Sequence, residues 1–170
     1  MGKQELEKEN NSRETGKLCQ KTLEEEDKLP PMERLEQGPV AVVECVEDIP
    51  CDPCVEACPV DAIEKKTLTS APEIRFEDCT GCGKCITSCP GLAIFVIDYN
   101  HEEDMAAVSL PYEFLPVPEE GEKVTILDRS GNMIGKGDVV NVRKSNNTHV
   151  VKIIVGKEIV MNARAIRVME

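Results

Sequence analysis

The sequence predicts an α+β chain in three parts, and two observations carry that prediction. A cysteine-rich motif occurs twice in the middle of the chain, which indicates a pseudo-twofold domain over residues 38–110. Short β-branched segments follow it and predict a small all-β barrel over residues 111–170. Residues 1–37 precede both as an extended, highly charged N-terminal arm. A chain of 170 residues has room for two small modules of this kind.

The N-terminal arm is rich in Glu, Lys, Asn and Gln and reaches Leu29-Pro30-Pro31 near its end. This composition favours a solvated, largely disordered segment. A helical arm that becomes ordered against a partner is the alternative, and it stays open. Cys19 lies in the arm without a neighbouring Cys or His, so we do not expect it to be a ligand.

The location of the chain is predicted from two features of its apolar residues. Its first residues contain no apolar core segment of a secretory signal. The longest apolar stretches, 92–97 and 150–155, are far shorter than the roughly 20 residues that a membrane span requires. We therefore expect a cytoplasmic protein that is not a membrane protein, in which cysteines serve more often as metal ligands than in disulfides.

The repeat in the middle segment is exact in its cysteines. Cys51-x2-Cys54-x3-Cys58-Pro59 aligns without gaps on Cys82-x2-Cys85-x3-Cys89-Pro90, at a constant offset of 31. Each half also has a strand candidate before its cysteine loop, over 40–46 and 73–76. The pattern predicts two structurally similar halves.

The predicted barrel begins after a connector over residues 99–115, which contains a polar run and Pro111. Gly and Asn in Ser130-Gly131-Asn132 tolerate positive φ, so this step is expected to form a hairpin turn. The five strand candidates are residues 124–127, 137–142, 150–155, 158–161 and 165–168.

The spacing Cys79-x2-Cys82-x2-Cys85-x3-Cys89-Pro90 indicates the cofactor. This run is typical of 4Fe-4S clusters, and its fourth cysteine binds the other cluster when two are present. A zinc ribbon can also use a Cys-x2-Cys pair, but it has no need of the Cys-Pro ending. The sequence therefore predicts two 4Fe-4S clusters.

The first half lacks a counterpart of Cys79, because Asp48 occupies that position. Cys45, three residues earlier, and the carboxylate of Asp48 are the two possible replacements. Thiolate is the softer ligand and suits iron–sulfur chemistry better, so Cys45 is favoured. Exchanging the fourth ligands between the halves then gives two complete sets. The first set is Cys45, Cys51, Cys54 and Cys89, and the second is Cys58, Cys79, Cys82 and Cys85.

With these motifs, residues 38–98 resemble a dicluster bacterial-type ferredoxin, from which the longer Cys45-x5-Cys51 spacing departs. Residues 38–45 and 49–54 more narrowly resemble ferredoxin-like subunits that accompany flavin-dependent dehydrogenases of amino acids and amines in anaerobic bacteria. The resemblance implies a ferredoxin-like fold and electron transfer. It also implies flavoprotein dehydrogenase partner subunits, and it allows for further iron–sulfur subunits in the same complex.

Charge and missing motifs exclude other function classes. Residues 38–110 hold 14 acidic and 4 basic side chains, which disfavours nucleic acid and favours a partner with a basic surface. No dinucleotide fingerprint, phosphate loop or nucleophile elbow is present, and His101 and His149 are interpreted as solvated. No catalytic residue is predicted. The leading hypothesis is the iron–sulfur subunit of a flavin-containing oxidoreductase complex, and a freestanding ferredoxin or a redox-sensing regulator are the alternatives.

Overall fold

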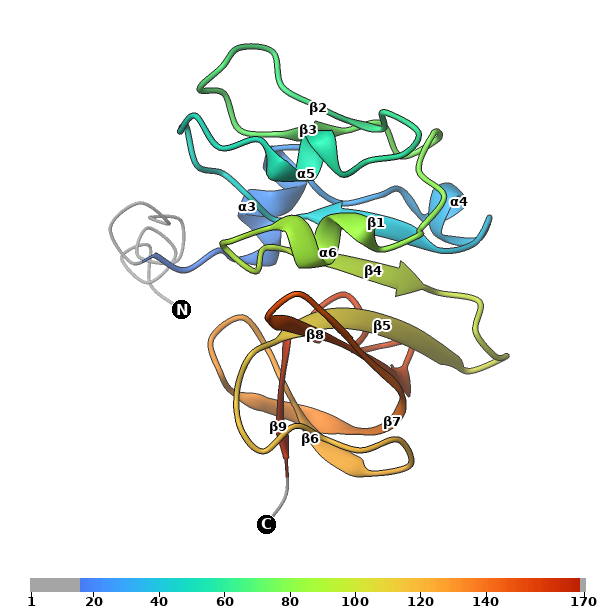
Figure 1. Ribbon diagram of the computed structural model, residues 1–170. Helices are drawn as coiled ribbons and strands as arrows, with labels where there is room; N and C mark the ends of the chain where they lie inside the picture. Colours follow the sequence, from blue (N-terminus) through green and yellow to red (C-terminus); the bar gives the residue numbers. More distant parts are fainter. Residues whose placement is uncertain (1–15, 169–170) are drawn as a thin grey trace, which may run out of the picture.

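The computed structural model describes residues 16–168, and most of its strands belong to one antiparallel sheet (Figure 1). The order in this seven-stranded sheet is β1-β4-β5-β8-β7-β6-β9. Its strands are β1 (Val40–Val43), β4 (Ile94–Asp98), β5 (Met105–Tyr112), β6 (Lys123–Leu127), β7 (Met133–Ser145), β8 (Thr148–Gly156) and β9 (Ala165–Val168). A second sheet contains β2 (Ile63–Glu64) and β3 (Glu73–Ile74). The described helices are α3 (Gln20–Glu25), α4 (Met32–Leu35), α5 (Pro53–Glu56) and α6 (Lys84–Ser88).

The cysteine repeat forms the upper half of the molecule in Figure 1. Each repeat forms one short helix that contains its middle cysteine, α5 with Cys54 in the first half and α6 with Cys85 in the second, and the two helices contact each other. Strand β1 before the first loop pairs with β4 after the second, with Val43 opposite Ile94. Because these β-branched residues are fully buried, they form an apolar floor beneath the cysteines.

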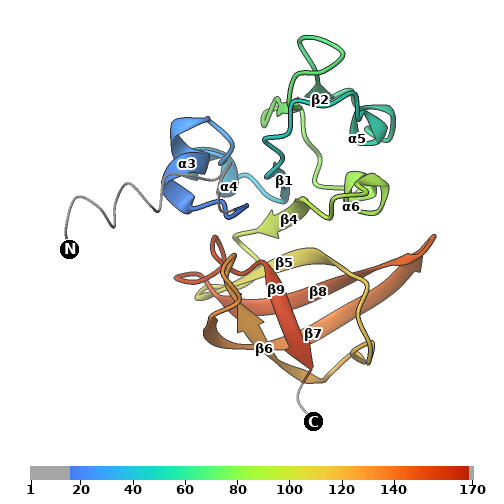
Figure 2. The same ribbon diagram turned by 90° about the vertical axis from the view of Figure 1, so that its left-hand side faces the viewer.

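The lower half of the molecule is a curled sheet of β5 to β9, which Figure 2 shows from the side. Strand β5 pairs with β4 on one edge and with β8 on the other, so one sheet runs through both halves. Gly131 in the turn between β6 and β7 has a φ of +79°, which confirms the expected hairpin turn.

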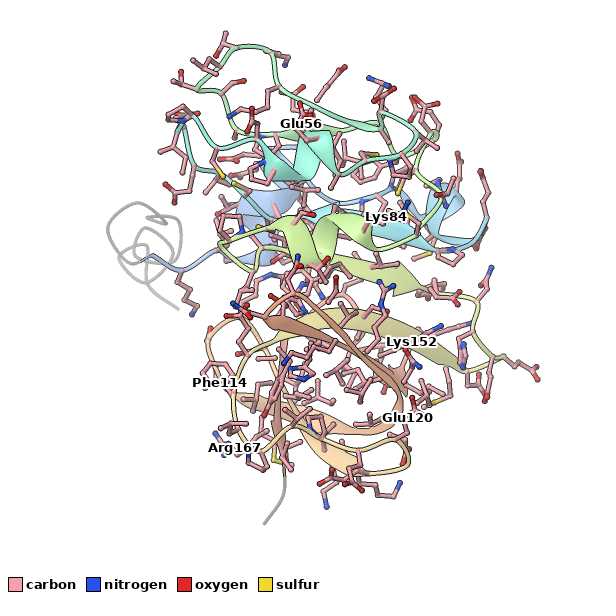
Figure 3. The ribbon with its side chains drawn as sticks, viewed as in Figure 1. Glu56, Lys84, Phe114, Glu120, Lys152 and Arg167 are labelled. Atoms are coloured by element: carbon pink, nitrogen blue, oxygen red, sulfur yellow. The ribbon has the colours of Figure 1, made fainter. Side chains whose placement is uncertain are left out.

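The expected closure of this barrel stays a prediction. In the part of the chain that the structure describes, no ladder joins β9 back to β5. A groove lies there instead, and Phe114 and Leu115, 71% and 88% exposed, contribute to its lining with Arg167. Figure 3 shows Phe114 and Arg167 well away from Glu56 and Lys84 of the cysteine repeat.

Two expected features of the C-terminal part are wrong. The connector over 99–115 contains strand β5, which crosses the predicted boundary at residue 110. The polar run at 101–104 and Pro111 concealed this strand, although Pro111 lies in the ladder opposite Val150. The strand expected over 158–161 is a turn, in which the backbone N–H of Ala163 donates to the carbonyl of Ile159. Val160 is buried in this turn, so its apolar character reflects burial and not strand pairing.

The arm is also packed more closely than expected over its described part, residues 16–37. Leu23 in α3 is buried at 0% exposure, and Leu35 at the end of α4 is buried at 2% exposure. The ammonium of Lys28 donates to the carbonyl of Pro72 at 2.7 Å. The solvated-arm interpretation is therefore wrong for these residues, because Leu23 is buried and Leu35 packs in one core cluster with Val40 of β1. Residues 1–15 of the expected arm lie outside the described residues.

Candidate iron–sulfur sites

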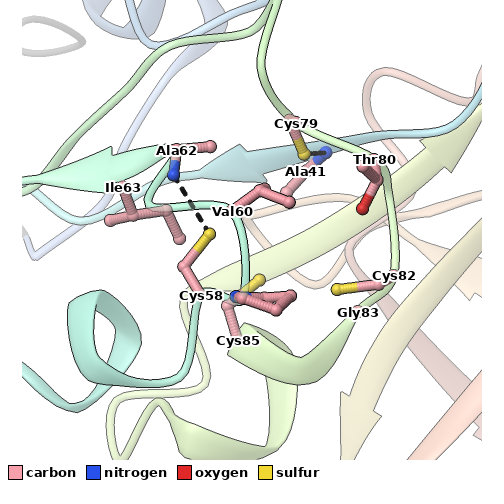
Figure 4. A pocket seen from close by; sticks show the side chains of 11 residues that line it. Ala41, Cys58, Val60, Ala62, Ile63, Cys79, Thr80, Cys82, Gly83 and Cys85 are labelled. Atoms are coloured by element: carbon pink, nitrogen blue, oxygen red, sulfur yellow. Dashed lines mark hydrogen bonds between the residues drawn. The ribbon is translucent and has the colours of Figure 1, made fainter.

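Four cysteines line one cavity together with Ala41 of β1, and we name this group site II (Figure 4). Its members are Cys58, Cys79, Cys82 and Cys85. Cys58 comes from the first repeat, whereas the other three come from the second. One of the four cysteines therefore comes from the other half of the repeat, the half that supplies it in the expected ligand set; its role as a ligand stays a prediction.

Four of the remaining five cysteines form site I, which has the same kind of arrangement as site II. Cys45, Cys51 and Cys89 line a second cavity, and Cys89 is the member that crosses from the second repeat. Cys54 completes the group, since its thiol lies close enough to Cys45 and Cys89 for their charges to raise its pKa, after the larger effect of burial. Asp48, the alternative to Cys45 as the fourth ligand, is exposed and is not among the residues that line this cavity.

Backbone N–H groups point at cysteine sulfurs in both sites. The bonds are Ala41 N–H and Gly81 N–H to Cys79 Sγ, both 3.4 Å, Ala62 N–H to Cys58 Sγ, 3.2 Å, and Ala93 N–H to Cys89 Sγ, 3.4 Å. Figure 4 draws two of them. A hydrogen bond of this kind stabilises the charged form of sulfur, so the loops are organised to hold thiolates.

Burial opposes these thiolates unless a positive group balances them. Burial raises the pKa of the Cys85 thiol to about 12, and the neighbouring thiols of Cys79, Cys82 and Cys58 add to the rise. A metal centre that binds four thiolates supplies the missing positive charge, because a coordinating thiol is deprotonated. The donor set of four soft sulfurs in each site therefore fits an iron–sulfur cluster. Within the described residues, no group of three or more His, Cys, Asp or Glu side chains is close enough together to hold a single metal ion.

A cation from outside each loop fixes the backbone of each site. Arg34 of α4 donates to four carbonyl oxygens, including that of Cys79 at 2.6 Å and that of Phe76 at 2.7 Å. Lys65 donates to the carbonyl of Cys51 at 3.0 Å and to that of Ile49 at 2.8 Å. Sequence reasoning missed both residues, because nothing in a solitary basic side chain indicates that it binds a carbonyl 14 residues away, as Lys65 does, or 45 residues away, as Arg34 does.

We predict that Arg34→Ala loosens site II. Hydrogen bonds from a charged donor contribute about 2 kcal/mol each, and the half-buried guanidinium makes several. The variant is expected to unfold at lower denaturant concentration and to lose iron faster in the presence of a chelator. Glu33→Ala, an exposed change on the same helix, is the matched control. Equal iron loss from the two variants would show that Arg34 does not organise the site.

The other candidate residues lie outside both cavities. Cys19 contacts the hydroxyl of Thr22, its sulfur and that oxygen being 3.1 Å apart. His101 lies 3.8 Å from the carboxylate of Asp98, and His149 is part of strand β8. None of them lines site I or site II.

Comparison with known proteins bears on what the cysteines bind. Residues 40–102 match the family described as the 4Fe-4S dicluster domain. These residues form a ferredoxin domain. It contains all eight cysteines of the two sites, from Cys45 to Cys89. Iron–sulfur binding and electron transfer follow as the function of this ferredoxin domain.

Curated relatives match short stretches of this chain. The polyferredoxin-like subunit of an aliphatic sulfonate oxidoreductase from Pyrococcus furiosus is 43% identical over 47 residues, which are 28% of this chain and 27% of that protein. The ferredoxin-type protein NapF of Haemophilus influenzae is 36% identical over 58 residues, 32% of this chain and 33% of that protein. An uncharacterised ferredoxin of Methanocaldococcus jannaschii is 48% identical over 44 residues, 26% and 28% of the two chains.

The chain thus spans about a third or less of the curated relatives that it matches. No solved structure matches the chain. In the described part of the chain, no helix has the length and apolar character needed to cross a bilayer. The family match covers residues 40–102, and the curled sheet, which begins at Met105 of β5, lies outside it.

Proposed function

We propose that this chain binds two 4Fe-4S clusters and serves as the iron–sulfur subunit of an oxidoreductase complex that contains a flavoprotein dehydrogenase. The observation that carries the proposal is the presence of two separate four-cysteine sites, each completed by a cysteine from the other repeat. Each cluster, when bound, can take up and release one electron.

In this proposal Cys45 and not Asp48 completes site I. Cys45 lines the cavity next to Cys51 and Cys89, whereas Asp48 is exposed on the loop between them in sequence. The softer thiolate also suits iron better than a carboxylate. The ligands of site I are then Cys45, Cys51, Cys54 and Cys89, and those of site II are Cys58, Cys79, Cys82 and Cys85.

Electron exchange with a partner requires a cluster close to the surface. Cys82 is exposed, whereas the other seven cysteines of the two sites, all within the described residues, are buried or half-buried. Site II is therefore the proposed point of exchange, and electrons would cross to site I through the shared core. The acidic surface of residues 38–110 favours a partner with a basic docking face.

Support for a complex comes from the relatives and from the charge of the chain. The Pyrococcus protein is named as a subunit of an oxidoreductase. A net charge of −12 favours rapid, salt-sensitive association with a basic partner. The proposal does not assign a substrate to this chain, because its work would be to pass electrons.

Native purification of the untagged chain under anaerobic conditions tests the proposal. We expect it to co-elute at low salt with a protein that carries flavin absorbance, and to separate from it as salt is raised. Elution as a monomer that still carries clusters would contradict the subunit assignment and favour a freestanding ferredoxin. Retention on DNA or RNA at low salt would instead favour a redox-sensing regulator.

A further inference from the structure

A buried group of three charged side chains lies behind site I, and we name it the Glu44 triad. It consists of Glu44, Arg129 and Arg164, whose side chains are 6%, 10% and 4% exposed. Glu44 follows strand β1, whereas Arg129 lies in the turn between β6 and β7 and Arg164 precedes β9. The curled sheet therefore places two arginines against the ferredoxin domain.

The carboxylate of Glu44 holds both arginines through short contacts. Arg129 Nη2 donates to Glu44 Oε1 at 2.6 Å and Arg129 Nε donates to Oε2 at 2.9 Å. Arg164 Nε donates to Oε1 at 2.7 Å. One carboxylate thus binds two guanidinium groups that are 85 and 120 residues away in sequence.

Glu44 connects this group to the cysteines of site I. It immediately precedes Cys45, and both residues line the site I cavity with Cys89. The backbone N–H of Glu44 donates to the carbonyl of Ala93 at 2.9 Å, in the segment that follows Cys89. Glu44 therefore belongs to the wall of site I, and its carboxylate holds both arginines next to that wall.

The triad carries one more positive than negative charge. The remaining donors of Arg129 bond to the Asn162 amide oxygen and the Met161 carbonyl, which are neutral. Arg164 bonds to two backbone carbonyls, and its guanidinium lies 4.9 Å from the centre of the Phe95 ring. Its Nη2 is buried and has no hydrogen-bond partner among the described residues.

This excess charge persists at neutral pH. Arginine remains protonated in proteins, and burial here lowers the Arg164 pKa only to about 10. In a region with little water, a fixed charge acts over a longer distance than at the surface. The site I cavity is therefore next to an uncompensated positive charge.

We propose that Arg129 and Arg164 raise the reduction potential of the cluster at site I by placing a net positive charge next to the wall of site I that Glu44 and Cys45 line. The inference rests on the proposed function, in which site I holds a 4Fe-4S cluster. One-electron reduction makes the cluster and its four thiolates one unit more negative, so a nearby fixed positive charge stabilises the reduced form.

A purely structural role of the triad predicts different effects when its members are removed. The same contacts could simply fasten the curled sheet to the ferredoxin domain. In that case, removing any member would loosen site I, whatever the sign of the charge removed. The electrostatic role requires opposite shifts, because loss of an arginine makes the triad neutral and loss of the carboxylate raises its charge.

Redox titration of the full-length chain, reconstituted anaerobically and followed by electron paramagnetic resonance, decides between the two roles. The signal of site I is assigned by its absence from Cys45→Ser protein. Arg164→Gln is expected to lower the ratio of reduced to oxidised site I cluster about tenfold at a fixed potential, which corresponds to about 59 mV for one electron. Glu44→Gln is expected to raise that ratio by a similar factor.

Two further variants serve as controls. Arg164→Lys keeps the charge and is expected to restore a potential close to that of the wild type. Arg143→Gln removes an arginine of the same sheet that is exposed and lies 3.5 Å from the carbonyl of Gly83 near site II. Because solvent screens this side chain, it is expected to change the site I ratio by less than about twofold.

The inference is overturned if Arg164→Gln and Glu44→Gln move the site I potential in the same direction, or leave it unchanged, while both keep their iron. If Arg164→Gln loses its cluster, Arg129→Gln is measured in its place and the same comparison with Glu44→Gln applies. Iron analysis of the wild type separates this outcome from failure of the proposed function. A wild-type chain with no cluster at site I contradicts both proposals. If the wild type holds that cluster but the site I potentials of the two variants do not shift in opposite directions, only this inference is contradicted.

Discussion

Cys45→Ser is expected to empty site I and to halve the iron content, from about eight to about four ions per chain. The reason is that Cys45 lines the site I cavity with Cys51 and Cys89, and three remaining thiolates leave one iron without its sulfur ligand. Site II should keep its cluster, because all four of its cysteines are unchanged. Iron and acid-labile sulfide analysis on anaerobically purified protein measures the effect.

Asp48→Ala is the matched control for this change. The aspartate is exposed and does not line the cavity, so the variant is expected to hold about as much iron as the wild type. Should the alanine variant lose half of its iron and the serine variant retain all of it, the assignment of the fourth ligand is reversed.

Gly81→Ala is expected to abolish cluster binding at site II and to lower the free energy of unfolding by about 3 kcal/mol. Gly81 lies between Cys79 and Cys82 with a φ of +66°. A Cβ at this position would lie 2.5 Å from Pro39 Cβ and 2.7 Å from the Pro39 carbonyl carbon and oxygen. Since backbone cannot move aside as a flexible side chain can, the loop must shift and the Cys79 sulfur loses the N–H of residue 81.

Gly131→Ala separates steric overlap from backbone strain. Gly131 has a similar φ of +79°, but a Cβ there meets open space. Only the strain of about 1 kcal/mol remains, and the iron content should not change. Denaturant unfolding and iron analysis of both variants test the prediction, which is contradicted if Gly81→Ala keeps a full complement of iron.

The cysteine arrangement could be predicted from sequence because it depends on local spacing. The gap-free repeat fixes which cysteines share a loop, and the Cys-Pro ending indicates which one crosses to the other half. The structure brings Cys58 beside Cys79 and Cys89 beside Cys45 accordingly. Their role as cluster ligands stays a prediction.

The supporting residues could not be predicted, because they act across long sequence separations. Arg34 bonds to a carbonyl 45 residues away, and Arg164 bonds to a carboxylate 120 residues away. The strand β5 was missed for a related reason. Its pairing with both β4 and β8 overrides the weak local signal of a segment that contains Pro111.

The arm shows the same limit of composition. A segment rich in Glu and Lys is interpreted as solvated, yet its few leucines decide where it packs. Leu23 and Leu35 bury against the rest of the chain and bring Arg34 to site II. Segments added to the ferredoxin domain thus supply cations to both sites, Arg34 at site II and the arginines of the Glu44 triad at site I.

The central claim is that the chain contains two closed iron–sulfur sites, and metal analysis of the full-length protein tests it most directly. Protein purified anaerobically is expected to contain about eight iron and about eight acid-labile sulfide ions per chain. About four of each would show that only one site binds a cluster. Stoichiometric zinc without sulfide would contradict the account altogether.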